Sequence, residues 1–211
     1  MIEKKFRYGT IWLLGIIILA YILQQFIPGF TETFLLDSSK AFSEPWRFLT
    51  AIFMHASITH ILLNGFALFL FGLLLEKEIG TKKFLLLFFA TGIFANIVSV
   101  FFYNQSLGAS GAIFGIMGML AVLRPMMTVW VSYVPMPMII AIFVWIAIDT
   151  FGILMPSNVA NIAHISGALF GLFAGIIQRF TSREPKIRKR EPISTNEEEA
   201  LDEYEREQGL R

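Results

Sequence analysis

Long apolar segments separated by short polar stretches repeat along most of the chain. A helix needs about 20 mainly apolar residues to cross the hydrocarbon core of a bilayer. Segments of this kind fall at about 10–27, 48–75, 84–103, 110–123, 129–154 and 160–178. The pattern therefore predicts an all-α, polytopic membrane protein built as a bundle of six transmembrane helices.

Two stretches differ from the apolar segments. Residues 28–45 mix polar and apolar side chains, which predicts a loop with structure of its own rather than a flexible linker. The end of the chain is highly charged and has no hydrophobic face wide enough for a core. We therefore expect a transmembrane domain over residues 1–180 and a charged, disordered cytoplasmic tail over residues 181–211.

Composition agrees with a membrane location. Hydrophobic residues make up 55% of the 211 residues and charged residues 16%, whereas charged residues are about a quarter of an ordinary soluble domain. The chain has no cysteine, so it forms neither a disulfide nor a thiolate metal site. We expect no cofactor, no metal and no nucleic-acid partner.

Lysine and arginine gather on one side of the predicted bundle. If six spans put both termini on the same side, that side carries 15 of the 17 Lys and Arg residues, and the other carries only Lys40 and Arg47. Cytoplasmic loops of membrane proteins hold the excess of positive charge. The bias predicts cytoplasmic termini and an outer location for the 28–45 loop. We expect the first apolar segment to be a retained span rather than a signal peptide, because no small-residue cleavage site follows it.

Polar residues cluster near the outer ends of the second, fourth and sixth segments. All three histidines, His55, His60 and His164, lie there. Ser110, His60 and His164 each precede a charged residue at the inner end of their segment by about 14 to 16 residues, or roughly 21 to 24 Å. Asn64 is one turn deeper on the face of His60. Because polar groups in a bilayer are costly, a set at one depth indicates function.

The fourth segment is too short to span a bilayer alone. Its start at Ser110 is expected inside the membrane, which predicts a polar pocket open to the outside. Glycines four residues apart in the fourth and sixth segments would let these two helices approach closely; they are Gly111, Gly115, Gly167, Gly171 and Gly175. His164 lies on the glycine face, so a hydrogen bond between Ser110 and His164 is expected.

This set of residues suits acyl transfer. A serine hydroxyl becomes a nucleophile when a nearby histidine takes its proton. Ser110 and His164 would form that dyad, while His60, Asn64 and the backbone N–H of Ser110 would stabilise the oxyanion. For Asp149, near the outer end of the fifth segment, we expect helix capping or contact with water rather than orientation of His164.

Each residue also has a structural interpretation. A serine at this position can cap a helix, and a histidine near a membrane interface often only makes a hydrogen bond. His60 and Asn64 can form a polar clamp between helices. The glycines pack helices under either interpretation. The placement of all four polar residues at one depth favours the catalytic interpretation.

Three blocks of the sequence resemble the rhomboid family of intramembrane serine proteases. They are EPWRFLT at residues 44–50 followed by HASITHILLN at 55–64, GASGAIFG at 108–115, and AHISGALFG at 163–171. The match covers residues 40–178 and is similar to the minimal six-helix form typical of prokaryotes. It implies that Ser110 is the nucleophile, His164 its base, and that His60, Asn64 and the Ser110 amide form the oxyanion hole.

The resemblance implies roles for other residues as well. His55 and Glu76 match structural positions of the family, and Trp46 and Arg47 belong to an outer loop that lies partly in the membrane. Phe114 occupies a position where an aromatic ring packs on the catalytic imidazole; some members have tyrosine there.

The resemblance implies a serine endopeptidase of the cell membrane that cuts single-span membrane proteins through an acyl-enzyme, with lipids around it. One alternative is a catalytically silent relative that binds and escorts membrane proteins, in which loss of Ser110 or His164 is expected. Another is a small transporter or channel, for which polar residues in both halves of the bilayer or an internal repeat are expected. The sequence carries no signal for the oligomeric state.

Overall fold

The computed structural model describes residues 8–155, 159–181 and 206. Residues up to Arg179 belong to one compact unit, and the remainder, Phe180–Arg211, to a second. The predicted charged tail over residues 181–211 lies outside the described residues except at Thr181 and Arg206. The basic residues at the start of the chain, Lys4, Lys5 and Arg7, lie outside them too.

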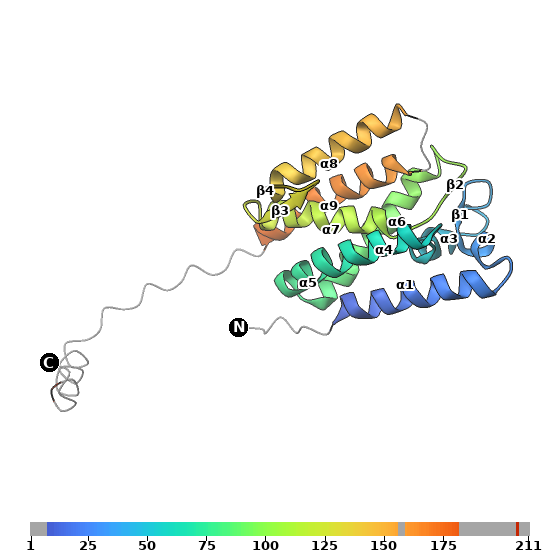
Figure 1. Cartoon of the computed structure of the whole chain (residues 1–211), viewed down its shortest axis with the longest axis horizontal. Coiled ribbons are helices and arrows are strands. Elements are labelled where there is room, and N and C mark those ends of the chain that lie inside the picture. The colour runs from blue at the N-terminus through green and yellow to red at the C-terminus, as the bar shows by residue number, and fades with distance from the viewer. Residues whose placement is uncertain (1–7, 156–158, 182–205, 207–211) are drawn as a thin grey trace. The chain divides into compact units, whose positions relative to one another are not determined.

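Apolar helices dominate the described part of the chain, and they lie side by side in a bundle (Figure 1). They are α1 (Gly9–Phe26), the continuous run of α4 (Ile58–Ala67), η2 (Leu68–Gly72) and α5 (Leu73–Ile79), α6 (Thr81–Ser99), α7 (Ser110–Leu123), α8 (Met138–Ile153) and α9 (Asn161–Thr181). Within these residues, α1, the α4–α5 run, α6 and α9 are long and apolar enough to cross a membrane, while α7 and α8 are shorter. The predicted helical, polytopic membrane fold is confirmed.

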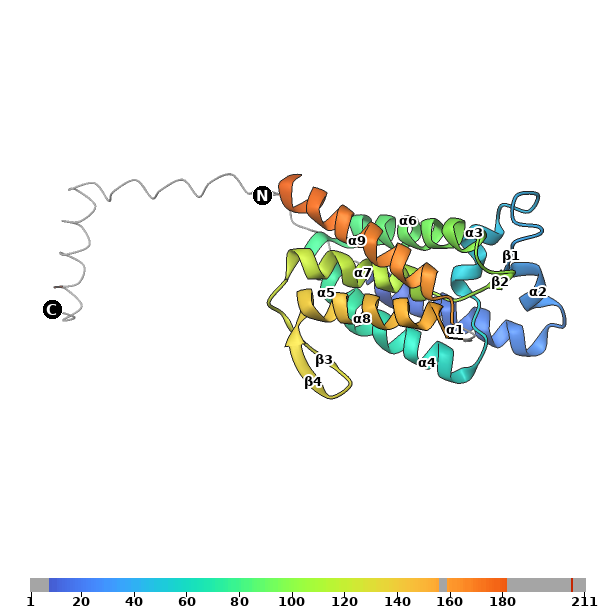
Figure 2. The same cartoon turned by 90° about the horizontal axis from the view of Figure 1, so that it is seen from above.

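A hairpin replaces the first part of the predicted fifth helix. Strands β3 (Thr128–Val131) and β4 (Val134–Pro137) pair antiparallel, and α8 begins only at Met138. Prolines at 135 and 137 lack the N–H that a helix needs. Ser132 and Tyr133 form the two-residue turn with φ of 48° and 68°, as hairpin turns require. The prediction of helix over 129–154 was therefore wrong at its start, and Figure 2 shows the hairpin projecting beside α8.

The loop over residues 28–45 is structured, as predicted. It contains α2 (Phe30–Phe34) and β1 (Leu36–Asp37), and it leads into α3 (Arg47–Thr50) and η1 (Ala51–Phe53). The buried Arg47 guanidinium donates to the carbonyls of Glu32 and Leu35 at 2.7 and 2.8 Å and pairs with the Glu44 carboxylate. A buried charge is stable only when it is paired in this way.

The same loop positions the segment that precedes α7. Strand β1 pairs antiparallel with β2 (Gln105–Ser106), so that Leu36 lies opposite Ser106. The Gly108 N–H donates to the Ala51 carbonyl at 2.9 Å. These backbone bonds fix the chain immediately before Ser110, because irregular backbone at membrane depth must find its partners within the protein.

Glu76 fastens three helices together at the opposite end of the bundle. Its side chain is fully buried and accepts hydrogen bonds from the backbone N–H groups of Gly9 and Thr10 at the start of α1. The hydroxyls of Thr10 and Thr81 donate to it as well. A carboxylate at the positive end of α1 is favourable for the helix dipole, and this geometry agrees with the structural role expected for Glu76.

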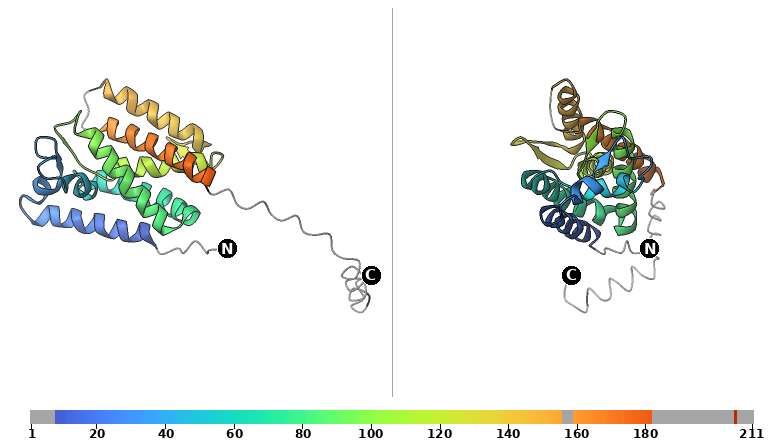
Figure 3. Two further views of the ribbon diagram at one scale, coloured as in Figure 1. Left: turned by 180° about the vertical axis from the view of Figure 1, so that it is seen from behind. Right: turned by 90° about the vertical axis from the view of Figure 1, so that its right-hand side faces the viewer.

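Helices α7 and α9, the yellow-green and orange ribbons of Figure 3, lie next to each other in the bundle, and their glycines bring the two backbones into contact. A Cβ atom at Gly167 would overlap the carbonyl oxygen of Gly111, and one at Gly171 would overlap that of Gly115. The same is true of Gly118 against the carbonyl oxygen of Ala168. The glycine spacing therefore produces the close helix contact that the sequence predicts.

We predict that Gly171→Ala lowers the thermal unfolding midpoint of the protein in detergent micelles, because the added methyl group must push α9 away from α7. Overpacking of this kind costs about 1–3 kcal/mol. Gly15→Ala on α1 is the matched control, since a Cβ there meets no atom within 4 Å. Equal midpoints for the two variants would contradict the close contact.

Candidate active site

Ser110 and His164 meet where α7 and α9 begin. Ser110 is the first residue of α7, and His164 lies in the first turn of α9. The Ser110 Oγ atom is 2.8 Å from the His164 Nε2 atom. The structure thus brings these two predicted site residues into hydrogen-bonding contact across 54 residues of sequence.

Phe114 supports the imidazole of His164 from one side. The two rings are stacked, with centroids 4.5 Å apart and planes 7° from parallel. Phe114 is one turn after Ser110 on α7, so a single helix supplies both the hydroxyl and the aromatic ring. This is the packing that the sequence resemblance implies for Phe114.

The second nitrogen of His164 also has a partner. Its Nδ1 atom is 3.1 Å from the Oδ1 atom of Asp149, which lies on α8 and is only 6% exposed. The expectation that Asp149 caps a helix or meets water was therefore wrong. The C-terminal end of α8 lies close to the start of α9 here, where Gly152 has no side chain; a Cβ atom there would lie 2.7 Å from the side-chain Nδ2 atom of Asn161.

The hydrogen-bond roles at His164 follow from the Asp149 carboxylate. An ionised carboxylate only accepts hydrogen bonds, so the proton of a neutral imidazole lies on Nδ1. The lone pair of Nε2 then faces Ser110, whose hydroxyl donates to it. Ser110 of α7, His164 of α9 and Asp149 of α8 thus form a continuous chain of two hydrogen bonds, with His164 in the middle.

His60 borders the segment that leads into Ser110. Ser57 caps α4 by accepting from the His60 backbone N–H at 3.1 Å, and the His60 Nδ1 atom accepts from the Ala56 N–H at 3.4 Å. A neutral ring in this state carries its proton on Nε2. A Cβ atom at Gly108 would lie 2.9 Å from that Nε2 atom, so His60 directs a donor toward the backbone two residues before Ser110.

Asn64 is buried one turn deeper on α4 than His60. It is 6% exposed, and its Nδ2 atom donates to the His60 carbonyl at 3.0 Å. A side-chain amide has two N–H donors, so this bond uses one of them. Asn64 is held by the backbone of its own helix, whereas His60 reaches the loop before Ser110.

His55 is tied into the fold. It is 1% exposed, its backbone N–H donates to the Gln24 side chain at 2.9 Å, and its Nδ1 atom is 3.2 Å from the Phe53 carbonyl oxygen. Gln24 belongs to α1, so His55 connects that helix to the start of α4. These contacts agree with the structural role expected for His55.

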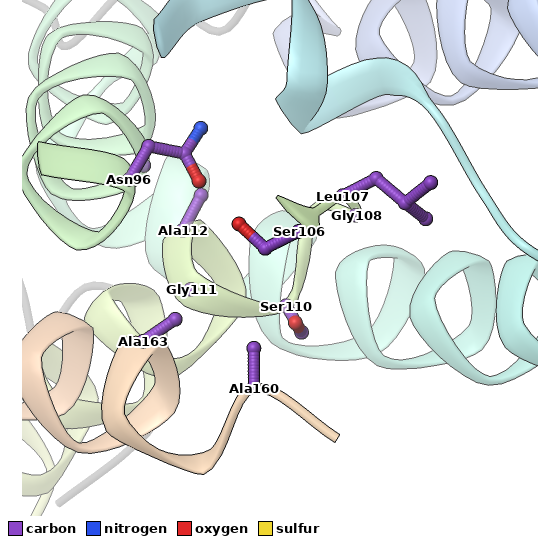
Figure 4. A pocket seen from close by; sticks show the side chains of 10 residues that line it. Asn96, Ser106, Leu107, Gly108, Ser110, Gly111, Ala112, Ala160 and Ala163 are labelled. Atoms are coloured by element: carbon purple, nitrogen blue, oxygen red, sulfur yellow. The ribbon is translucent and has the colours of Figure 1, made fainter. Parts of the chain in front are cut away.

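A small cavity lies beside Ser110, between α6, α7 and the start of α9. Figure 4 shows Ser106 between Asn96 and Ser110 at this cavity. The Ser106 Oγ atom is buried and has no hydrogen-bond partner among the described residues. The cavity is lined by Gly92, Asn96, Ser106, Leu107, Gly108, Ser110, Gly111, Ala112, Ala160 and Ala163. The expected opening of the site to the outer side stays a prediction.

Asp149 is the residue beside the site whose contact with His164 the sequence analysis did not predict. A signal was present, because Asp149 is an acidic residue in an otherwise apolar helix and Gly152 follows it on the same face. The spacing does not show which helix packs against that face, so the contact of Asp149 with His164 was not predicted.

Comparison with known proteins places the described site inside a recognised domain. The family model described as Rhomboid domain matches residues 43–179. The putative rhomboid protease YdcA of Bacillus subtilis is 34% identical over 149 residues, which are 69% of this chain and 71% of that protein. Rhomboid protease GluP of the same organism is 36% identical over 166 residues, 74% of this chain and 32% of GluP.

A plant protein is similar to a comparable degree. RHOMBOID-like protein 6, mitochondrial, of Arabidopsis thaliana is 35% identical over 137 residues, 64% of this chain and 44% of that protein. The chain therefore spans less than half the length of this relative and of GluP.

We predict that Gly108→Ala displaces His60 and destabilises the protein by about 1–3 kcal/mol, because its φ of 121° disfavours a side chain and the new methyl group collides with the imidazole. Gly29→Ala is the control, since Gly29 also has a positive φ, 79°, but open space around its Cβ position. Thermal unfolding of both variants in micelles measures the difference. An equal loss of stability in Gly108→Ala and Gly29→Ala would argue against the contact between residue 108 and His60.

Proposed function

The chain belongs to the rhomboid family, and from this premise we propose that it is an intramembrane serine endopeptidase with a Ser110–His164 dyad. The observation that carries the proposal is the 2.8 Å contact between Ser110 Oγ and His164 Nε2. Family membership and relatives named as rhomboid proteases support intramembrane proteolysis in general. The roles of the individual residues are the finer part of the proposal.

The protein is a membrane protein, as its Rhomboid domain and its long apolar helices indicate. We place it in the cell membrane with both termini in the cytoplasm and the site toward the outer side. The charge bias supports this orientation, since Lys77, Lys82, Lys83 and Arg124 lie at the end of the bundle away from Ser110.

In the first half of the reaction, the Ser110 oxygen attacks the carbonyl carbon of the scissile peptide bond. His164 accepts the hydroxyl proton on Nε2 and then gives it to the leaving amine as the C–N bond breaks. The product of this half is an acyl-enzyme on Ser110. In the second half, His164 takes a proton from a water molecule as the water oxygen attacks the ester carbonyl carbon. It then gives this proton to the Ser110 oxygen as the ester C–O bond breaks and the acid product leaves.

The negative charge that develops on the carbonyl oxygen needs donors in place before reaction. The backbone N–H of Ser110 is one, because the first N–H groups of a helix have no partner within the helix and lie at its positive end. His60 Nε2 and Asn64 Nδ2 are the proposed side-chain donors. The tautomer of His60 and the free second N–H of an amide support these roles.

Single-span membrane proteins are the proposed substrates. A peptide bond in a regular transmembrane helix is hydrogen-bonded and shielded, so a segment must unwind before a serine can attack it. Ser110 lies at the helix start rather than at mid-helix, beside a small cavity with polar groups. Such a place suits an extended segment and the water of the second half-reaction.

We predict that the purified protein cleaves a tagged single-span substrate in detergent or proteoliposomes, and that Ser110→Ala abolishes cleavage while His164→Ala lowers kcat by at least about 10³-fold. The fragments are quantified by mass spectrometry. Ser99→Ala is the control, because Ser99 is a buried serine of α6 outside the proposed site. This variant should cleave the substrate as the unmodified protein does.

A well-folded protein that does not cleave the tagged single-span substrate would contradict the proposal. It would favour the catalytically silent relative that binds and escorts membrane proteins. Cleavage that persists in Ser110→Ala would overturn the assignment of the nucleophile.

The orientation is testable by cysteine labelling, because the chain has no cysteine of its own. We predict that Lys40→Cys reacts with a membrane-impermeant maleimide in intact cells, since the 28–45 loop is proposed to lie outside. Lys82→Cys should react only after the membrane is permeabilised. Both positions are exposed, so each serves as the accessibility control for the other, and the reverse pattern would contradict the orientation.

A further inference from the structure

We infer that Asp149 on α8 is a positioning residue that fixes the orientation and tautomer of His164. The inference deepens the proposed function and rests on it, because it assumes that His164 is the base for Ser110. It adds a third member, from a third helix, to the proposed dyad.

The burial of Asp149 is the first observation. The residue is 6% exposed and lies in an otherwise apolar part of α8. An acidic side chain in a transmembrane segment is costly and needs a partner. The partner is His164, whose Nδ1 atom is 3.1 Å away, and the two side chains are only 9% and 13% exposed. Water therefore screens this contact weakly.

The second observation is that the other contacts of His164 do not decide which ring nitrogen carries the proton. Phe114 stacks on one face of the imidazole and fixes its plane. The Ser110 hydroxyl can donate a hydrogen bond to Nε2 or accept one from it, so that contact is compatible with both tautomers. The ionised Asp149 carboxylate only accepts, so it selects the tautomer with the proton on Nδ1.

With Nδ1 protonated and held by Asp149, the lone pair of Nε2 faces the Ser110 hydroxyl. This is the tautomer that a general base for Ser110 requires. When Ser110 loses its proton, the imidazole becomes positively charged, and the adjacent carboxylate stabilises that charge. Asp149 itself keeps no proton in any step, so it acts through His164 and does not touch the substrate.

The contact also makes the geometry of the site depend on α8. Ser110 and Phe114 come from α7, His164 from α9 and Asp149 from α8. Gly152, three residues after Asp149, lets α8 lie against Asn161 at the start of α9. A shift of the outer end of α8 would therefore withdraw the carboxylate from His164.

The test uses Asp149→Asn, which keeps the size of the side chain but lacks the charge and can offer either an oxygen or an N–H to Nδ1. We expect kcat for a single-span substrate to fall about 10²- to 10⁴-fold, with KM within about threefold and the thermal midpoint nearly unchanged. Asp149→Glu should recover part of kcat. Thr150→Val is the control, because Thr150 is exposed and its hydroxyl bonds only within α8, to the Ile146 carbonyl.

A spectroscopic measurement reads the tautomer without any need for cleavage. In protein labelled with ¹⁵N-histidine, the His164 signals should report a protonated Nδ1, assigned by their loss in His164→Gln. Asp149→Ala should convert them to a mixture of tautomers, and Thr150→Val should leave them unchanged.

The two measurements separate this inference from the proposed function. An active protein whose Asp149→Asn variant keeps its kcat and its Nδ1 signal would overturn the positioning role alone. A protein that never cleaves would overturn the proposed function, and the ¹⁵N signals would still decide the role of Asp149. Loss of the Nδ1 proton in Asp149→Ala supports the inference, and its persistence refutes it.

Discussion

The close approach of α7 and α9 is the constraint on which the rest of the site depends. Ser110 and His164 stand at the starts of these two helices, and their side chains are short, so they meet only when the two backbones touch. Gly167 and Gly171 make that contact possible, because any side chain there would overlap a carbonyl oxygen of α7. Packing along the middle of these two helices therefore sets the 2.8 Å distance between Ser110 Oγ and His164 Nε2 at their starts.

The charged and polar groups around this helix pair follow one rule of the membrane environment. A polar group without water must find its partners in the protein. Glu76 does so with the start of α1, and Arg47 with carbonyls of the 28–45 loop. Asp149 and His164 satisfy each other in the same way. The contacts of Glu76 and Arg47 hold helices and a loop in place. The contact between Asp149 and His164 lies beside the Ser110 hydroxyl, and for this reason we infer a functional role for it.

Much of this arrangement could be predicted from the sequence, because hydropathy and glycine spacing are local signals. Most of the helical segments, the structured 28–45 loop and the meeting of Ser110 with His164 were predicted in this way. The β3–β4 hairpin was not, since Val129 and Val131 raise the apolar average of a segment that Pro135 and Pro137 prevent from being helical. The partner of Asp149 was missed because the rotation of one helix against another depends on packing between distant segments, which no local pattern records.

The proposed function requires that Ser110 is an activated nucleophile. Intact-mass analysis of the purified protein after reaction with a fluorophosphonate tests this most directly, because the reagent needs an activated serine and no protein substrate. We expect one adduct per chain, located on Ser110 by peptide mapping and strongly reduced when His164 is replaced. A folded protein that forms no adduct, or forms it on another serine, would show that Ser110 is not an activated nucleophile.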